Sequence, residues 1–209
     1  MSAIWTKICG ITRVEDAEAA AEMGADAVGL VLYATSPRAV PVESVTTLFG
    51  QLPNRIRRVA LLVNPESELV QRAVASQCVD LLQFHGSESA QLCRQFGVPY
   101  MKAIRVQDFQ QAIDEIEQHP NAEMILLDKY VENVPGGTGQ SFDWSLAAQL
   151  VADTELPVVL AGGLHPDNVA AAIEQVKPFG VDVSSGVEKA PGEKDLAAMR
   201  NFIEMSKSV

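Results

Sequence analysis

Short apolar segments alternate with helix-length amphipathic segments eight times along this chain of 209 residues. Each apolar segment is short and largely continuous, as in parallel strands that are covered on both faces, whereas half-exposed antiparallel strands alternate apolar with polar residues. The predicted strands are 4–9, 27–32, 57–63, 79–84, 100–104, 124–128, 158–161 and 181–184. The alternation therefore predicts the α/β class, with a parallel sheet and helices packed against it.

Helices are predicted between these strands. Asp and Ser at several helix starts are favourable N-cap residues, and Gly24 and Gly97 lie just past two helix ends. The predicted helices are 14–23, 67–76, 89–95, 109–118, 144–151, 167–176 and 195–205, and the segment 41–52 completes the set. Because an open doubly wound sheet usually has fewer strands, eight strand–helix units predict a closed eight-stranded parallel (β/α)8 barrel, the TIM-barrel fold, as a single domain over 1–209.

Composition narrows the classes of function. A hydrophobic fraction of 47% is enough to bury a substantial core, and the net charge of -11 argues against nucleic acid and anionic membranes as partners. The sequence has no basic, apolar leader and no run of 18 apolar residues, and its three cysteines do not form a disulfide or zinc pattern. We therefore expect a soluble cytoplasmic protein in which Cys78 and Cys93 are packing residues.

Active sites of such barrels lie at the carboxyl ends of the strands and in the loops that follow. The residues expected at this mouth are Cys9, Arg38, Asn64, Gln83, His85, Arg105, Asp128, Gly162, Gly163, Ser184, Ser185 and Gly186. Cys9 ends the first strand and Asp128 the sixth, so a thiol and a carboxyl would share one mouth. Alone, Cys9 would be interpreted as a buried core thiol. Paired with Asp128, it is a candidate base, and Asp128 is a candidate acid.

Two glycine-bearing turns follow the seventh and eighth strands, where barrels of this kind often bind phosphate. One contains Gly162 and Gly163, and the other contains Ser184, Ser185 and Gly186. Glycine lets backbone N–H groups approach an anion closely, and a helix N-terminus adds a favourable dipole. An isolated Gly-Gly pair can also be a simple tight turn, but two such turns on neighbouring strands favour a phosphate site.

Other residues near the predicted mouth have two interpretations each. Arg38 could bind a carboxylate through two hydrogen bonds, or it could form a surface salt bridge. The glycine-rich segment 135–139 could cover a substrate or be a simple connector. Lys7 shares the face of its strand with Cys9 and is a hypothetical cation beside the thiol, while His85 is expected to order its loop.

Seven motifs, in the same order along nearly the whole chain, resemble phosphoribosylanthranilate isomerases of tryptophan biosynthesis. They are KICGIT at 7–12, SPR at 36–38, QFHG at 83–86, LLD at 126–128, GGTG with FDW at 136–144, LAGGL at 160–164 and VDVSSGVE at 181–188. One motif on its own would be weak, but the ordered set is specific. Phe84 departs from the leucine that many members carry, and this change is not expected to affect the chemistry.

The resemblance implies an aldose–ketose isomerase, an intramolecular oxidoreductase that performs an Amadori rearrangement by general acid–base catalysis without a cofactor or metal. Its substrate would be N-(5-phosphoribosyl)anthranilate, and its product would be 1-(2-carboxyphenylamino)-1-deoxyribulose 5-phosphate. By the same resemblance, Asp128 would protonate the furanose ring oxygen and Cys9 would remove the proton from the sugar C2. Arg38 is the candidate for binding the anthranilate carboxylate. The chain could be a monomer or a homodimer.

The proposed acid and base each face a difficulty. Carboxylic acids are normally ionised and thiols normally protonated at neutral pH. An acid at this position therefore needs burial or a nearby negative charge, and a thiol base needs a lowered pKa or transient deprotonation.

Two other classes of function remain open from the sequence. A phosphosugar lyase or epimerase on the same barrel would use a Schiff-base lysine, for which Lys102 and Lys129 are candidates, or a metal cluster, for which we find no ligand pattern. A non-catalytic protein could keep the barrel and its anion site. The pairing of Cys9 with Asp128 is the feature that favours the isomerase over both.

Overall fold

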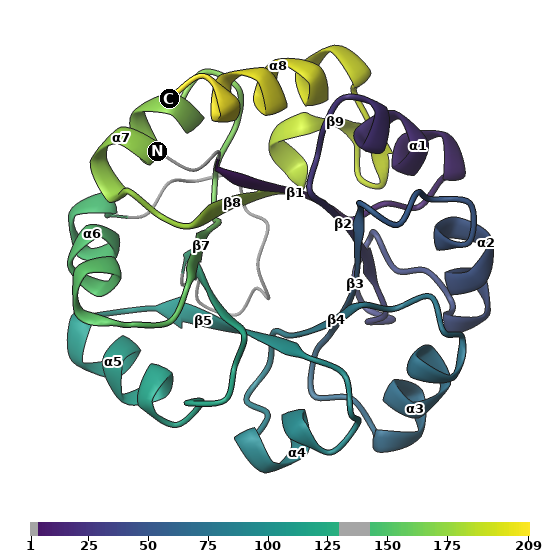
Figure 1. Ribbon diagram of the computed structural model, residues 1–209, viewed down its shortest axis with the longest axis horizontal. Coiled ribbons are helices and arrows are strands. Elements are labelled where there is room, and N and C mark those ends of the chain that lie inside the picture. The colour runs from purple at the N-terminus through teal and green to yellow at the C-terminus, as the bar shows by residue number, and fades with distance from the viewer. Residues whose placement is uncertain (1–3, 130–142) are drawn as a thin grey trace.

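The computed structural model describes residues 4–129 and 143–209. Eight parallel strands follow one another around a closed barrel, in which β8 pairs with β1 (Figure 1). The strands are β1 Trp5–Cys9, β2 Ala27–Val31, β3 Arg57–Leu62, β4 Leu81–Phe84, β5 Tyr100–Val106, β6 Met124–Lys129, β7 Val158–Leu160 and β8 Gly180–Val183. The TIM barrel predicted from the alternation is therefore confirmed.

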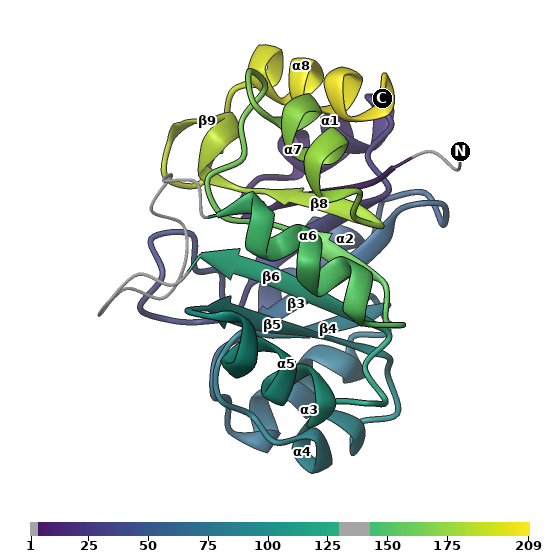
Figure 2. The ribbon, with the colours of Figure 1, turned by 90° about the vertical axis from the view of Figure 1, so that its left-hand side faces the viewer.

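The helices form a ring outside the barrel, and Figure 2 shows them lying against the sheet from the side. They are α1 Val14–Glu22, α2 Val45–Phe49, α3 Ser67–Ala75, α4 Ala90–Arg94, α5 Phe109–Glu117, α6 Trp144–Asp153, α7 Val169–Val176 and α8 Leu196–Lys207. Two short 3-10 helices, η1 Val42–Ser44 and η2 Ser185–Val187, and a small hairpin of β9 Glu188–Ala190 and β10 Glu193–Lys194 complete the described elements. Among the described residues, no helix has the length and apolarity needed to cross a membrane.

The strands are apolar throughout because both of their faces are buried. Successive side chains point to opposite faces of a strand, so Ile8 of β1 packs toward the helices while Lys7 and Cys9 point into the barrel. The lower part of the barrel interior is filled by Ala27, Val59, Leu81, Met101, Ala103, Met124, Leu126, Val159 and Ala161. These packed side chains form the floor of the barrel interior, and the open end of the barrel lies at the carboxyl ends of the strands.

Several predicted boundaries are wrong by a few residues, for local reasons. β4 begins at Leu81 rather than at 79. The backbone N–H of Arg58 on the neighbouring strand donates to the Asp80 carboxylate, which also accepts from the Arg58 guanidinium, so this N–H does not form a strand-to-strand hydrogen bond with a backbone carbonyl of residues 79–80. The segment 41–52 divides into η1 and α2, and α7 begins only at Val169. Arg105 lies within β5 rather than after it.

Candidate active site

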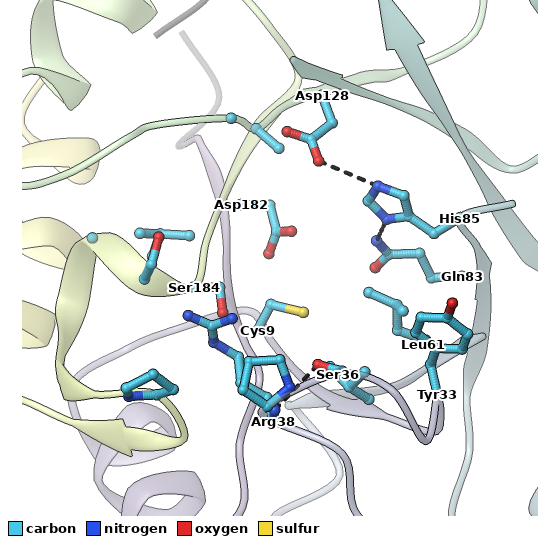
Figure 3. Close-up of a pocket in the computed structure, with 18 of the residues that line it drawn as sticks. Cys9, Tyr33, Ser36, Arg38, Leu61, Gln83, His85, Asp128, Asp182 and Ser184 are labelled. Carbon is cyan, nitrogen blue, oxygen red and sulfur yellow. Dashed lines mark hydrogen bonds and ion pairs between the residues drawn. The ribbon is translucent and has the colours of Figure 1, made fainter. Parts of the chain in front are cut away.

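A pocket of about 450 Å³ opens at the carboxyl ends of the strands (Figure 3). The pocket is lined by all eight residues predicted to act in catalysis or substrate binding, namely Cys9, Arg38, Asp128, Gly162, Gly163, Ser184, Ser185 and Gly186. Asn64 and Arg105, also expected at the mouth, are not among its lining residues. Instead, the Asn64 side chain accepts a hydrogen bond of 2.8 Å from the Ser87 backbone and braces the loop after β4. The pocket therefore brings together the thiol, the carboxyl and both glycine turns.

Cys9 ends β1 with its thiol in the wall of the pocket. The residue is 4% exposed and packs against Val31 of β2 and Leu61 of β3. Burial raises the pKa of the Cys9 thiol, and the nearby ammonium of Lys7 opposes that rise without cancelling it. The thiol therefore remains protonated at neutral pH in the unliganded pocket, and the base form has to be generated.

Lys7 is completely buried inside the barrel, and its Nζ lies 2.9 Å from Oδ1 of Asp182. Burial alone would lower the pKa of Lys7, but the negative charges of Asp182 and of the Cys9 thiolate outweigh it and leave that pKa raised. Lys7 is therefore a charged group beside Cys9, as hypothesised from strand alternation. Asp182, which also lines the pocket, was not anticipated.

Asp128 is the second-last residue of β6 and lies on the opposite side of the pocket from Cys9 (Figure 3). Its Oδ1 accepts a hydrogen bond of 2.8 Å from the Lys129 backbone, and its Oδ2 lies 3.2 Å from Nε2 of His85. The latter distance suits an ion pair, but the geometry at Nε2 is not that of a formed hydrogen bond. His85 thus faces the acid candidate in addition to belonging to the loop that it was expected to order.

Gln83, on β4, lies next to His85, which directly follows that strand. Its Nε2 is 3.3 Å from His85 Nδ1, while its buried Oε1 has no hydrogen-bond partner among the described residues. If Gln83 Nε2 donates a hydrogen bond to His85 Nδ1, then Nδ1 carries no proton. The proton of a neutral His85 is then on His85 Nε2, which faces Asp128. The buried amide therefore controls how the imidazole meets the carboxyl.

Arg38 reaches the pocket from the loop after β2 and is engaged by a carboxylate of the protein itself. Its Nε lies 2.9 Å from Glu188 Oε1 and its NH2 lies 2.7 Å from Glu188 Oε2. With a side chain only 13% exposed, Arg38 does not form the surface salt bridge considered as an alternative. Burial alone would raise the pKa of Glu188, but the Arg38 hydrogen bonds and the charge of Lys194 outweigh it and leave that pKa lowered.

Lys194, on β10, joins this ion pair to the strand ends. Its Nζ lies 2.8 Å from Glu188 Oε1 and donates to the backbone carbonyls of Cys9 at 2.6 Å and Ser184 at 3.1 Å. Burial lowers the pKa of Lys194, and Glu188 partly restores it. The hairpin after β8 therefore ties the arginine to the two strands that carry the thiol and one glycine turn.

The two glycine turns fit together through backbone contacts. Gly162 and Gly163 have φ values of 79° and 77°, in the left-handed region that favours glycine. A Cβ on Gly162 would lie 2.8 Å from Asp128 Oδ1, and one on Gly186 would lie 1.9 Å from the Leu164 carbonyl oxygen. Among the described residues, the N–H groups of Gly163 and Gly186 have no acceptor, so they remain available to an anion.

Two groups of residues considered in the sequence analysis lie outside the lining of this pocket. Lys102, considered as a Schiff-base lysine, is not part of the pocket lining and pairs with Glu88 at 3.1 Å. Cys93 is buried away from the pocket and Cys78 is half-buried, as packing residues would be. The glycine-rich segment 135–139 lies outside the described residues, so its role as a cover remains a prediction.

The sequence interpretation missed Asp182, Glu188 and Lys194 as parts of the site. A signal was present for Asp182, because a charged residue within an apolar strand, two positions before Ser184, must point into the barrel. Glu188 and Lys194 lie on a short hairpin, which could not be predicted from a pattern of apolar residues in the sequence.

The fold and the pocket define a class: a (β/α)8-barrel enzyme with acid–base groups and an anion-binding rim at the carboxyl ends of its strands. The family model of N-(5'-phosphoribosyl)anthranilate isomerase matches residues 6–205. The chain belongs to this family. It is an enzyme that converts N-(5-phosphoribosyl)anthranilate to 1-(2-carboxyphenylamino)-1-deoxyribulose 5-phosphate in tryptophan biosynthesis, as the motifs implied.

Three relatives illustrate the match. N-(5'-phosphoribosyl)anthranilate isomerase of Pseudomonas aeruginosa is 50% identical over 100% of this chain and 97% of its own length. A solved phosphoribosyl anthranilate isomerase in complex with reduced 1-(o-carboxyphenylamino)-1-deoxyribulose 5-phosphate is 36% identical, with a TM-score of 0.87 over 99% of this chain and 100% of its own. Monomers generated from the dimeric enzyme of Thermotoga maritima are 36% identical, with a TM-score of 0.86 and the same coverage.

Proposed function

We propose that Cys9 is the general base and Asp128 the general acid of this isomerisation. One observation carries the proposal: the thiol and the carboxyl come from β1 and β6 and face one pocket whose rim is formed by two glycine turns (Figure 3). A sugar phosphate anchored at the rim would present its ring carbons between the two groups. This arrangement supports proton removal on one side and proton donation on the other.

The proposed sequence of steps balances without any external reagent. Asp128 donates its proton to the furanose ring oxygen while the bond between that oxygen and C1 breaks, and the anilino nitrogen lone pair forms the C1=N bond of a protonated Schiff base. The Cys9 thiolate then takes the proton from C2. The electrons of that C–H bond form C1=C2 and neutralise the nitrogen, which gives an enolamine. Transfer of the enol proton to C1 yields the ketone, and return of a proton from the Cys9 thiol to Asp128 restores the acid and the base for the next turnover.

The remaining site residues would bind the two anionic ends of the substrate. We assign the phosphate to the turns with Gly162, Gly163, Ser184, Ser185 and Gly186, supported by their open N–H groups and left-handed glycines. The local backbone would supply this attraction in spite of the net charge of -11.

We assign the anthranilate carboxylate to Arg38. Glu188 occupies the Nε edge of its guanidinium, and a guanidinium carries further N–H groups on its other edge. Arg38 could thus keep its protein partner and still bind a carboxylate through two hydrogen bonds.

Two further properties are proposed from relatives and composition. One relative binds a reduced product analogue, and we propose that this chain binds its phosphorylated substrate in the pocket described above. The T. maritima relative is dimeric, and homodimerisation is proposed here as well. The free thiols of the described residues support a reducing, cytoplasmic setting.

Substitution of the acid and the base tests the proposal. Cys9→Ser and Asp128→Asn are each expected to lower kcat by roughly a hundredfold or more, with product affinity largely retained. Turnover is followed by the loss of phosphoribosylanthranilate fluorescence, and product affinity by calorimetry. Cys93→Ser is the matched control, because it removes a buried thiol outside the pocket. Rates like wild type in both site variants would refute the assignment.

A further inference from the structure

We propose that Lys7 is the counter-cation of the Cys9 thiolate, and that Asp182, by sharing the same ammonium group, limits how much thiolate forms. Lys7 would then be a positioning residue that acts through Cys9. The inference rests on the proposed role of Cys9 as the base. It supplies what the pocket otherwise lacks, a reason why a buried thiol could lose its proton.

The Lys7 ammonium and the Cys9 sulfur lie close to the same position inside the barrel, beside Gly29. Lys7 and Cys9 share the inner face of β1, and Cys9 is paired in register with Gly29 of β2. A Cβ on Gly29 would lie 3.1 Å from Cys9 Sγ and 3.2 Å from Lys7 Nζ. The missing side chain of Gly29 therefore leaves the space in which these two groups approach each other.

Lys7 needs an anion because its ammonium is fully buried. Asp182, its register partner on β8, provides one through a contact of 2.9 Å. An ammonium has three N–H groups, and the described residues contribute Asp182 Oδ1 as the one oxygen acceptor within hydrogen-bond distance of Nζ. Donor capacity therefore remains for a thiolate at Cys9, although Asp182 already neutralises the charge.

The charges around Cys9 act in opposing directions. The described charged or titratable groups around Cys9 are Lys7 on β1, Tyr33 and Arg38 after β2, His85 after β4, Asp128 on β6, Asp182 on β8 and Lys194 on β10. The neighbours on β2 and β3 are apolar. Burial raises the pKa of Cys9, Lys7 gives the largest opposing effect, Asp182 adds to the rise, and Lys194 opposes it more weakly.

This balance predicts opposite results for the two members of one ion pair. Loss of Lys7 removes the cation that stabilises the thiolate, whereas loss of the Asp182 charge frees that cation for the thiolate alone. A pair that only supported the fold would respond in the same direction to both changes.

The experiment measures the alkylation rate of Cys9 by iodoacetamide against pH, with the modified peptide quantified by mass spectrometry. Lys7→Met is expected to slow alkylation about tenfold at a given pH, and Asp182→Asn to accelerate it by a similar factor. Lys207→Met is the control: it removes an ammonium that pairs with Asp26 outside the pocket. Its Cys9 profile is expected to equal that of the wild type.

Gly29→Ala provides a second route if Lys7→Met does not fold. The added methyl group would occupy the space between Sγ and Nζ, so Cys9 alkylation is expected to slow as in Lys7→Met. Unchanged alkylation in both variants, or shifts of the same sign in Lys7→Met and Asp182→Asn, would overturn the inference.

The alkylation result is independent of catalysis. If Cys9→Ser kept the wild-type kcat, the proposed base would be wrong, while the coupling between Lys7 and Cys9 would still be decided by alkylation. If both proposals hold, Lys7→Met also lowers kcat with little change in KM, and the pH profile of kcat shifts to higher pH.

Discussion

At the scale of single residues, the side chains that line the pocket could be predicted, but several of their partners could not. Cys9 and Asp128 end predicted strands and Arg38 follows one, so their positions along the chain place all three at one mouth. The pairing of Lys7 with Asp182 depends on how β1 and β8 meet when the barrel closes, 175 positions apart in sequence. The pattern of apolar residues in the sequence does not specify which residue of β1 pairs with which residue of β8.

Arg38→Ala should raise KM for phosphoribosylanthranilate with a smaller effect on kcat, because the variant lacks the proposed ligand of the carboxylate. The measurement compares the natural substrate with an analogue that lacks the carboxylate. KM for the analogue should respond little to the substitution. Equal losses for both substrates would show that Arg38 does not recognise this group.

Glu188→Gln should also raise KM, by roughly tenfold, since a neutral amide holds the Arg38 guanidinium less firmly than a carboxylate does. Steady-state kinetics at saturating and limiting substrate separate KM from kcat. Glu43→Gln, which weakens an exposed pair with Arg72, is the control and should match the wild type. A KM unchanged by Glu188→Gln would mean that the ion pair with Glu188 does not affect how Arg38 binds the substrate.

At the scale of elements, strands were predictable to within a few residues, whereas the loops that shape the pocket were not. The loop after β4 shows why. The buried carboxylate of Glu88 accepts hydrogen bonds from the backbone of Asn64 at 2.7 Å and Gly86 at 3.0 Å, and it pairs with Lys102 of β5 at 3.1 Å. Three separate elements meet at one carboxylate, and this carboxylate fixes the loop that carries His85.

Glu88→Gln should therefore cost both stability and turnover. Neutralising one partner of a buried ion pair leaves the Lys102 ammonium uncompensated, at a cost of about 3 kcal/mol in the free energy of unfolding. Urea denaturation measures that loss, and kcat should fall because the His85 loop no longer holds its position beside Asp128. Lost stability with full kcat would separate the loop from the chemistry.

At the scale of the whole molecule, the eightfold alternation was sufficient to predict a closed barrel because an open doubly wound sheet usually has fewer strands. It could not predict which polar groups the closed structure buries. His119 has no catalytic partner in the sequence, yet it lies buried beside Tyr100, whose hydroxyl is 3.4 Å from its Nδ1. Burial, together with the nearby charge of Lys102, lowers the pKa of His119 to about 4.

This buried imidazole links the stability of the molecule to pH. An unfolded histidine takes up a proton near a pH of about 6.5, whereas folded His119 does so only near the lower value. Between these two values the unfolded state binds more protons, so the free energy of unfolding falls as the solution becomes more acidic and is fully regained above the higher value. Asp80 and Glu188, whose pKa values are lowered in the fold, stabilise it at neutral pH, and this contribution is lost only when the pH falls below the ordinary carboxylate range.

His119→Phe isolates the effect, because it keeps an aromatic ring against Tyr100 and removes the titrating nitrogens. Urea unfolding at about pH 7, 6 and 5 should show a decline in the wild type and a smaller decline in the variant. The variant can be less stable than the wild type at neutral pH, since repacking affects every pH equally, so the slope with pH is the quantity to compare. Equal slopes in the two proteins would mean that His119 does not couple folding to protonation.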